Sequence, residues 1–256
     1  MRKLFKAGLE LTANVVSIFI NQLVNLLEVG PIRSRILWLE FLFNFKLLGW
    51  RLAQFLPLIV EERVVEYPFV LKNLGEKKLR VLDVGCCKSL LIAELVSMGH
   101  DAYGIDVNTY RPKFDGLQFI RVDVRKMPFQ NEFFDAVIAV SVMEHVGLDE
   151  NGDSVAIEEI FRTLKPEGIF ILTAPFSKWY QMSWQRFYNK AYLDKLLRSF
   201  MLLKEEYYIR HRFLWRRVSR KSAELEPSKI TNSVCCLVLR KPSTQRCGVH
   251  FTERKD

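Results

Sequence analysis

The chain has 256 residues, of which 49% are hydrophobic, and a formal net charge of +9. This length and composition are enough for one large domain with an appendage. Residues 71–200 carry 17 basic and 17 acidic side chains, whereas residues 201–256 carry 13 and 6. Because the positive excess is C-terminal, the composition argues against a protein whose main role is to coat nucleic acid. The five cysteines show no C-x-x-C spacing, so the sequence predicts no metal site and a reducing compartment.

The first 75 residues are rich in large hydrophobic side chains, and we expect residues 1–75 to form a helical extension. Residues 11–27 lack charged side chains, but polar residues recur there every three or four positions, and the run is short for a membrane span. A second apolar segment covers residues 33–55. Residues 9–58 suit a lid on the main domain, a homodimer interface or a contact with a membrane surface. No signal-peptide cleavage site is recognisable, so we expect a cytoplasmic location, with peripheral membrane attachment as an alternative.

Apolar runs and helical patterns alternate from residue 76 to residue 243. Strand-like runs lie at residues 79–84, 102–105, 117–121, 136–140 and 169–173, and helical patterns at 89–98 and 154–164. Alternation with short connections predicts an α/β domain with a Rossmann-like, mostly parallel sheet and helices on both faces. Runs at 201–209 and 234–240 predict a closing antiparallel hairpin around a basic segment. Residues 244–256 have the composition of a loose C-terminal tail.

The first strand leads into a tight turn, Asp83-Val84-Gly85-Cys86-Cys87-Lys88-Ser89. A strand that delivers an acid and a glycine to the start of a helix is typical of a nucleotide-binding corner. Asp83 would repel a pyrophosphate, and two positions where a dinucleotide site needs glycine hold Cys87 and Ser89. A cationic cofactor without phosphates suits this corner better. S-adenosyl-L-methionine fits that description, and NAD does not.

Two more acids follow the next two strands. Asp106 comes 23 residues after Asp83, the usual interval for an acid that accepts from both ribose hydroxyls. Asp123 ends the third strand, where its carboxylate can accept from an adenine amino group between apolar neighbours. Because ligands of open α/β sheets lie beyond the carboxyl ends of the strands, we predict a single cofactor site. Its predicted residues are Asp83, Gly85, Cys86, Asp106, Val107, Asp123, Val124 and Ser141.

The fourth strand leads to Ser141-Val142-Met143-Glu144-His145-Val146, where cofactor and substrate should meet. His145 is the candidate general base for a hydroxyl or protonated amine acceptor. Glu144 is a second candidate, or a partner that orients His145. The same Glu-His pair also suits a helix cap or a wall of the cofactor pocket.

Residues 175–188 are rich in aromatic side chains. Tyr180, Trp184 and Arg186 are the candidate substrate contacts, although the aromatics suit packing against the N-terminal helices equally well. The segment 210–221 has six Lys or Arg residues and no acid. It suits an anionic acceptor, anionic lipid headgroups, RNA, or a solvated loop between strands.

In this order the motifs resemble the class I S-adenosylmethionine-dependent methyltransferases, in particular the small-molecule branch called type 11. The matching pieces are Val81-Leu82-Asp83-Val84-Gly85-Cys86, Gly104-Ile105-Asp106, Asp123 with Met127-Pro128-Phe129, Phe134-Asp135-Ala136-Val137, Glu144-His145, and Glu159-Ile160-Phe161-Arg162-Thr163-Leu164-Lys165-Pro166 with Gly168. The resemblance implies a seven-stranded sheet with an antiparallel last strand. It also implies that Asp83 and Gly85 contact the methionine part of the cofactor, Asp106 the ribose and Asp123 the adenine. The sequence departs from the family's glycine pattern at Cys87 and Ser89.

We therefore expect methyl transfer from S-adenosyl-L-methionine to oxygen or nitrogen of a small-molecule, lipid-linked or glycan acceptor, with S-adenosylhomocysteine as product. One alternative is a binding or scaffold protein that keeps the fold but has impaired catalysis, as the changes at Cys87 and Ser89 suggest. Another is an RNA or protein methyltransferase. Families of that kind commonly carry Asn/Asp-Pro-Pro-aromatic after the fourth strand, where this chain has residues 141–144 instead, so we expect no nucleic-acid partner.

Overall fold

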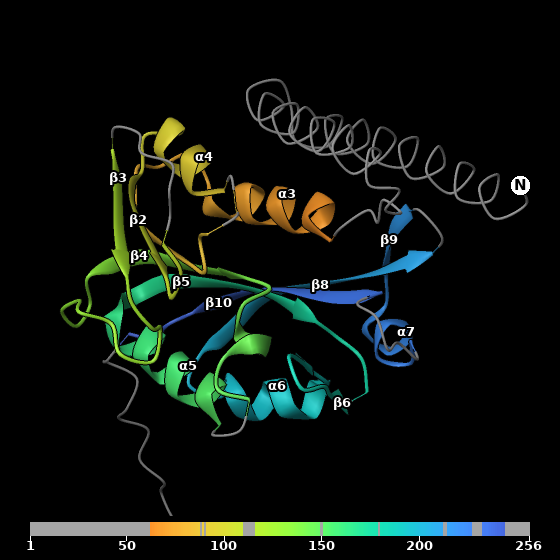
Figure 1. Cartoon of the computed structure of the whole chain (residues 1–256). Helices are drawn as coiled ribbons and strands as arrows, with labels where there is room; N and C mark the ends of the chain where they lie inside the picture. The colour runs from red at the N-terminus through yellow and green to blue at the C-terminus, as the bar shows by residue number, and fades with distance from the viewer. Residues whose placement is uncertain are drawn as a thin grey trace, which may run out of the picture.

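An eight-stranded mixed sheet lies between two layers of helices in the computed structural model (Figure 1). The strand order is β3-β2-β1-β4-β5-β10-β8-β9. The structure describes residues 62–87, 89, 91–109, 116–148, 151–178, 180–211, 214–226 and 232–243. The segments expected to be helical at residues 11–27 and 33–55, and the expected tail at 244–256, lie outside these residues.

Five parallel strands form one side of the sheet. They are β1 (Arg80–Val84), β2 (Asp101–Asp106), β3 (Leu117–Arg121), β4 (Phe134–Val140) and β5 (Leu164–Pro175). Helix α4 (Leu91–Ser97) connects β1 to β2, and α5 (Gly152–Thr163) precedes β5. The strand order reverses between β1 and β4, which is where open α/β sheets bind their ligands. The predicted Rossmann-like fold class is confirmed.

Three further strands complete the sheet with antiparallel pairing. They are β8 (Met201–His211), β9 (Leu214–Val218) and β10 (Ser233–Arg240). Strand β10 lies between β5 and β8 and pairs antiparallel with both, as the predicted closing hairpin requires. Strand β9 is an eighth strand, beyond the seven expected, and it pairs with β8 inside the basic segment 210–221. It forms because Trp215 is a buried anchor in a run that otherwise looks like a solvated loop.

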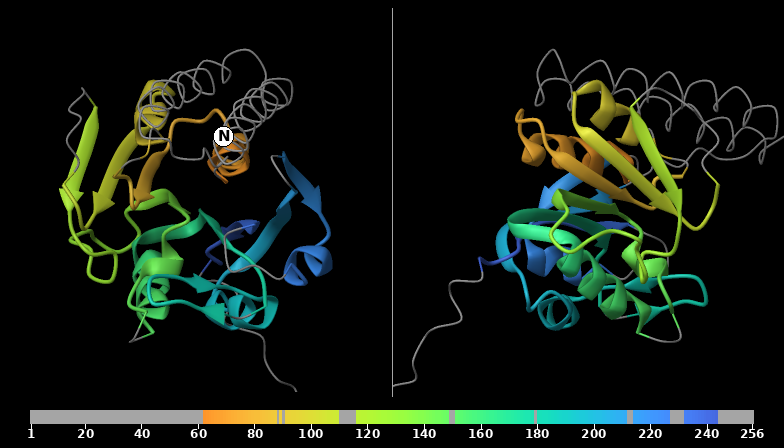
Figure 2. Two further views of the ribbon diagram at one scale, coloured as in Figure 1. Left: turned by 45° about the vertical axis from the view of Figure 1, so that its right-hand side comes forward. Right: turned by 90° about the vertical axis from the view of Figure 1, so that its left-hand side faces the viewer.

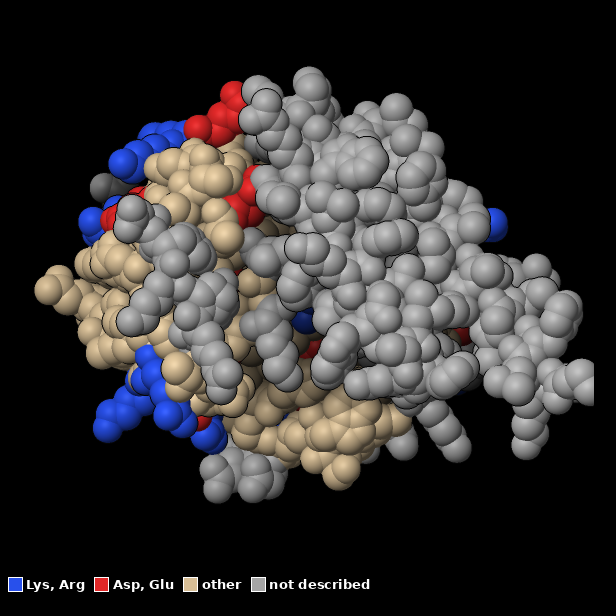
Figure 3. Space-filling model, turned by 45° about the horizontal axis from the view of Figure 1, so that its top comes forward, with Lys and Arg blue, Asp and Glu red and all other residues tan. Residues whose placement is uncertain are grey.

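Basic side chains near β9 are paired with acids of the neighbouring strand. Arg217 lies 3.5 Å from the carboxylate of Glu206, and Arg220 lies 3.3 Å from that of Glu205. Figure 3 shows a different face, on whose described part Lys and Arg side chains lie in separate groups with Asp and Glu among them. On this face and around β9, the basic side chains therefore lie among acidic ones and do not form one continuous positive patch.

Each face of the sheet packs against its own helices, because side chains alternate along a strand. In β4, Val137 and Ala139 belong to the core beside α5, whereas Ala136, Ile138 and Val140 belong to the core beside α4. Figure 2 shows the two helical layers on opposite sides of the sheet. The remaining described elements are η1 (Met143–His145), β6 (Tyr180–Gln181), β7 (Arg186–Phe187), α6 (Lys190–Leu196) and α7 (Arg220–Glu224).

Helix α3 (Arg63–Leu74) belongs to the expected N-terminal extension, yet it packs directly on the sheet. Its side chains Val70, Leu71 and Leu74 are buried in the core that contains α4. Each such burial is worth about 1.5–3 kcal/mol, so this helix is an integral layer of the fold. Among the helices that the structure describes, none is long and apolar enough to cross a bilayer.

Candidate active site

A cleft of about 350 Å³ opens at the carboxyl ends of β1 to β4, where the strand order reverses. Its lining is Val84, Gly85, Ile105, Asp106, Val107, Asn108, Val122, Asp123, Val124, Arg125, Ser141, Val142, His145, Val146 and Gly147. Most of the predicted cofactor residues therefore come together at one place. Asp83, Cys86 and Glu144 do not line the cleft and are buried.

The turn after β1 depends on a glycine at position 85. Gly85 has φ +75°, and a Cβ there would lie 2.4 Å from Cγ2 of Val142. Its backbone N–H donates to the carbonyl of Ile105 at 2.8 Å, as does that of Cys86 at 3.2 Å. A side chain at position 85 would be strained and would collide with the turn after β4. This residue therefore sets how closely the two turns approach.

Asp106 lies at the rim of the cleft and joins two loops. One carboxylate oxygen accepts from the backbone N–H of Cys87 at 3.0 Å, and the other accepts from the backbone and side-chain nitrogens of Asn108 at 2.8 and 3.1 Å. A carboxylate has about four lone-pair sites. The oxygen bonded to Cys87 can therefore accept further donors such as ribose hydroxyls.

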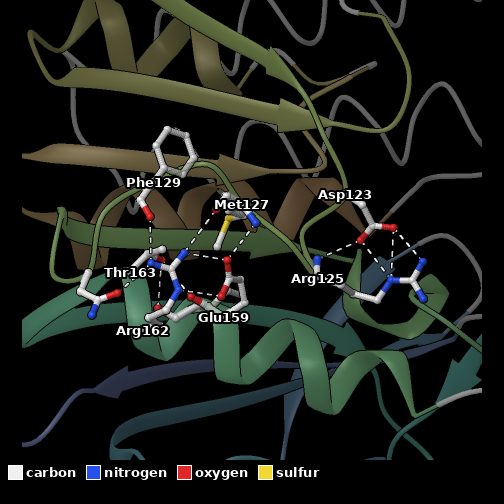
Figure 4. Close-up of polar contacts among 9 residues, drawn as sticks. Asp123, Arg125, Met127, Phe129, Glu159, Arg162 and Thr163 are labelled. Atoms are coloured by element: carbon white, nitrogen blue, oxygen red, sulfur yellow. Dashed lines mark hydrogen bonds and ion pairs between the residues drawn. The ribbon is translucent and has the colours of Figure 1, made fainter.

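Asp123 is also at the rim, but its carboxylate is paired with its neighbour Arg125 (Figure 4). The backbone and guanidinium nitrogens of Arg125 donate to both carboxylate oxygens at 2.8–3.1 Å. These side-chain hydrogen bonds lower the pKa of Asp123 below its usual range. An adenine amino group would have to share this carboxylate with Arg125, so the adenine contact stays a prediction.

The loop that carries Asp123 is tied to helix α5. Glu159 accepts from the backbone N–H of Met127 at 2.8 Å, and Arg162 donates to the carbonyl of Phe129 at 2.8 Å (Figure 4). Glu159 and Arg162 also pair with each other. These motif residues are thus structural ties between two parts of the fold.

Buried acids form the floor beneath the cleft. Asp83 is 2% exposed, and burial raises its pKa to about 8. Glu144 is 1% exposed, and burial raises its pKa well above the ordinary value. One oxygen of each carboxyl has no hydrogen-bond partner in the described part of the chain. Burial thus favours the neutral form of Asp83, and its contact with the methionine part of the cofactor stays a prediction.

Two residues of α3, which the sequence did not indicate, reach this floor. A carboxylate oxygen of Glu66 accepts from the hydroxyl of Ser141 at 2.7 Å, and Arg63 pairs with Glu66. Glu66 is fully buried. Its partner is 75 positions away in the sequence, so the acid looked like one of many charges on a helix surface. No local signal could have identified it.

His145 lies at the wall of the cleft and is partly exposed. Its Nδ1 is 2.7 Å from the carbonyl oxygen of Trp184. Because a carbonyl can only accept, Nδ1 carries a proton in this contact, and in the neutral ring the lone pair is then on Nε2. Nε2 lies 4.0 Å from a carboxyl oxygen of Glu144. The two rings of His145 and Trp184 stack with centroids 6.0 Å apart.

Arg186 is buried, and its guanidinium binds other groups of the protein. Its two terminal nitrogens donate to the carbonyls of Val146 and Gly147 at 2.7 and 2.6 Å. Asp153 lies 3.8 Å away as its counter-ion. The structure thus gives Arg186 a role in holding the cleft wall, and a direct substrate contact stays a prediction. Trp184 is 56% exposed beside the cleft, and the side chain of Tyr180 lies outside the described residues.

The donor set of the lining fits S-adenosylmethionine better than a nucleotide with a pyrophosphate. Val107 and Val124 offer apolar contact for an adenine, and Asp106 retains acceptor capacity for ribose hydroxyls. The lining contains one arginine, Arg125, which is already paired with Asp123. The cleft volume lies in the range typical of small-molecule sites.

Comparisons of the sequence agree with this chemistry. Residues 82–172 match the family Methyltransf_11, described as a methyltransferase domain. The sterol 24-C-methyltransferase ERG6B of Gibberella zeae is 34% identical over 115 residues, which is 40% of this chain and 29% of the relative. The sterol 24-C-methyltransferase of Debaryomyces hansenii is 32% identical over 107 residues, covering 37% of this chain and 27% of the relative. The matches thus span less than a third of these relatives.

Solved structures share the fold. The 1,6-didemethyltoxoflavin-N1-methyltransferase of Burkholderia thailandensis, crystallised with 1,6-didemethyltoxoflavin and S-adenosylhomocysteine, has a TM-score of 0.54 at 18% identity and covers 70% of this chain and 77% of its own. An S-adenosylmethionine-dependent methyltransferase from Mesorhizobium loti has a TM-score of 0.51 at 16% identity, with coverages of 68% and 97%. One family assignment accounts for the ordered acids at the strand ends, for the cleft at those ends and for the matched domain. Residues 82–172 therefore form a methyltransferase domain of the class I S-adenosylmethionine-dependent type, a family whose cofactor is S-adenosylmethionine.

Proposed function

We propose that the chain transfers a methyl group to oxygen or nitrogen of a small-molecule, lipid-linked or glycan acceptor and releases S-adenosylhomocysteine. The cofactor supplies an electrophilic methyl group on a sulfonium. The acceptor must then be aligned and, where it is a hydroxyl or protonated amine, lose a proton. The observation that carries the proposal is His145, whose Nε2 is left as an acceptor by the Nδ1 contact while its ring lines the cofactor cleft.

In this proposal His145 takes the acceptor's proton at Nε2, and the Trp184 carbonyl holds the ring in the required tautomer. Glu144, buried beside Nε2 at 4.0 Å, orients the ring. Arg186 holds the wall formed by Val146 and Gly147. Trp184, exposed beside His145, offers a face on which an acceptor can stack.

The relatives favour a lipid among these acceptor classes. Two of them are named as methyltransferases that act at C-24 of a sterol, although they share only part of their length with this chain. We therefore place lipid-like acceptors first in a search. A suitable assay follows transfer of a labelled methyl group from S-adenosylmethionine to sterols, lipid-linked compounds and glycans in parallel.

Two measurements test the function. Calorimetric titration with S-adenosylhomocysteine should show micromolar binding. With an acceptor in hand, His145→Ala should lower kcat by about 10²–10⁴-fold and leave the affinity for S-adenosylhomocysteine within a few-fold of wild type. Nearly full turnover by this variant would falsify the assignment of His145 as the base.

A scaffold role is the alternative from a different class, and the side chains of Cys87 and Ser89 in the cofactor turn favour it. The fold itself is compatible with other activities, since the [4+2]-cyclase SpnF has a TM-score of 0.50 at 21% identity over 68% of this chain and 81% of its own. No detectable binding of S-adenosylmethionine or S-adenosylhomocysteine would support the scaffold.

We propose that the chain has no nucleic-acid partner, because the basic side chains Arg217 and Arg220 pair with acids of β8. The proposed location is the cytoplasm, as expected from the sequence. We further propose that residues 9–58 mediate a homodimer or contact with a membrane surface. Liposome flotation and light scattering on the full chain and on a chain that lacks residues 1–58 would distinguish these roles. Identical behaviour of the two chains in both measurements would exclude both.

A further inference from the structure

Ser89 occupies a position where the family's pattern has glycine, and its side chain forms hydrogen bonds. Its Oγ lies 2.8 Å from the hydroxyl of Tyr67 in α3. The same oxygen accepts from the backbone N–H of Leu91, the first residue of α4, at 3.0 Å. Tyr67 is 4% exposed. The serine therefore joins the cofactor turn to the helix on the sheet's face, which a glycine could not do.

Glu66, the residue before Tyr67, contacts the turn after β4. Glu66 accepts from the hydroxyl of Ser141 at 2.7 Å, and Ser141 lines the cleft. Ser141 has φ +48°, a left-handed conformation that costs a non-glycine residue free energy. Its backbone N–H donates to the carbonyl of Thr173 at 3.0 Å. The hydrogen bond to Glu66 gives this strained turn a second attachment.

Successive residues of a helix point in different directions, and α3 uses this to reach both turns. Tyr67 contacts the turn after β1 and Glu66 contacts the turn after β4. These two turns also meet at Gly85, which packs against Val142. One helix is thus attached to both strand ends where the order of the sheet reverses.

We propose that Glu66 and Tyr67 are positioning residues for the cofactor cleft, and that Ser89 replaces a family glycine in order to make one of the two attachments. Helix α3 then sets the spacing between the turn after β1 and the turn after β4. The chain keeps a working cofactor turn without the second and third glycines, because side-chain hydrogen bonds hold the shape that glycines would otherwise permit. This inference rests on the proposed function, since it requires that the cleft binds the cofactor.

The experiment measures the affinity of the full chain for S-adenosylhomocysteine by calorimetry. Tyr67→Phe, Ser89→Ala and Ser141→Ala each remove one hydroxyl, and we expect about three- to tenfold weaker binding for each. Because Ser89 also accepts from the backbone N–H of Leu91, the double variant should lose no more than the Ser89→Ala single variant does. Ser89→Gly, which restores the family residue, should also weaken binding.

Matched controls remove hydroxyls elsewhere. Tyr207→Phe breaks the hydrogen bond to Glu205 on β8, and Ser97→Ala breaks the one to the carbonyl of Glu94 at the far end of α4. Both control variants should lower the melting temperature without changing the affinity for S-adenosylhomocysteine. If Tyr67 and Ser89 had a merely structural role, their variants would behave in the same way as these controls.

The outcomes separate the two proposals. A wild-type chain that does not bind S-adenosylhomocysteine overturns the proposed function and, with it, this inference. Wild-type binding with unchanged affinities in Tyr67→Phe, Ser89→Ala and Ser141→Ala overturns the inference alone. Tighter binding by Ser89→Gly also overturns it.

Discussion

The rim and the floor of the cleft each contain acids, but the two pairs are in different environments. At the rim, Asp106 and Asp123 are partly exposed and accept hydrogen bonds from nearby nitrogens. On the floor, Asp83 and Glu144 are buried, and each has one oxygen without a partner among the described residues. Burial penalises the charged form of a carboxyl, whereas donated hydrogen bonds favour it.

This difference shows that an acid at a strand end is not automatically a ligand group. The rim acids have the solvent access that recognition of a polar cofactor requires. Burial raises the pKa of Asp83 to about 8, which favours the neutral form of this floor acid. The comparison can be tested by substitutions in both places.

The largest effect on binding is expected from Asp106→Ala at the rim. The variant loses the carboxylate that is predicted to accept from the ribose hydroxyls, and it releases the backbone N–H of Cys87. Such bonds are worth about 1.5–3 kcal/mol, so the affinity for S-adenosylhomocysteine should fall by about 10- to 100-fold. Asp101→Ala is the matched control, since Asp101 lies at the opposite end of the same strand, away from the cleft. Equal effects of the two variants would contradict a ligand role for the rim.

The second-largest effect is expected from Asp83→Asn on the floor of the cleft, and it concerns the free energy of unfolding. The unfolded chain releases this proton near the ordinary aspartate pKa of 3.8, whereas the folded chain retains it up to pH about 8. The wild type therefore loses free energy of unfolding as the pH rises through this window, by up to about 1.4 kcal/mol per pH unit. Asparagine does not titrate, so the variant should gain stability relative to wild type between pH 4 and 8. Urea denaturation at several pH values measures this, and a pH-independent difference would contradict it.

A smaller effect is expected from Glu144→Gln. If Glu144 is a neutral group that orients His145, glutamine is close to it in shape and charge, and kcat should stay within about threefold of wild type. If Glu144 acts instead as the general base, kcat should fall by about 10²–10⁴-fold. Steady-state assays with an identified acceptor decide between the two, with His145→Ala as the reference variant.

The smallest effect is expected from Arg125→Ala at the rim. Arg125 and Asp123 are a partly exposed pair, and such pairs contribute about 0–1 kcal/mol to stability. Removal of Arg125 frees the carboxylate for an adenine amino group, so the affinity for S-adenosylhomocysteine should rise slightly, by less than about fivefold. Calorimetry checks the direction. A loss of affinity would mean that Arg125 orients Asp123 usefully.

The parallel half of the sheet and the position of the cleft can both be predicted from the amino-acid sequence. Runs of apolar residues, the glycine at position 85 and the acids at the strand ends are local signals, because strand periodicity and turn geometry involve neighbours in the chain. Strand β9 was missed because one buried tryptophan, Trp215, stabilises it among arginines. Its pairing with β8 depends on tertiary packing more than on local pattern.

The roles of the polar residues, by contrast, depend on contacts between distant parts of the chain. The sequence predicts Arg186 as a substrate contact, because it lies in an aromatic-rich segment. In the structure its guanidinium donates instead to two backbone carbonyls that are 39 and 40 positions away in the sequence. Glu66 resembles a surface charge until α3 packs against the sheet and brings it to Ser141. Asp83 and Asp106 follow the same sequence rule, yet only one lies at the rim. Burial and long-range hydrogen bonds separate these roles, because they depend on how distant segments pack together.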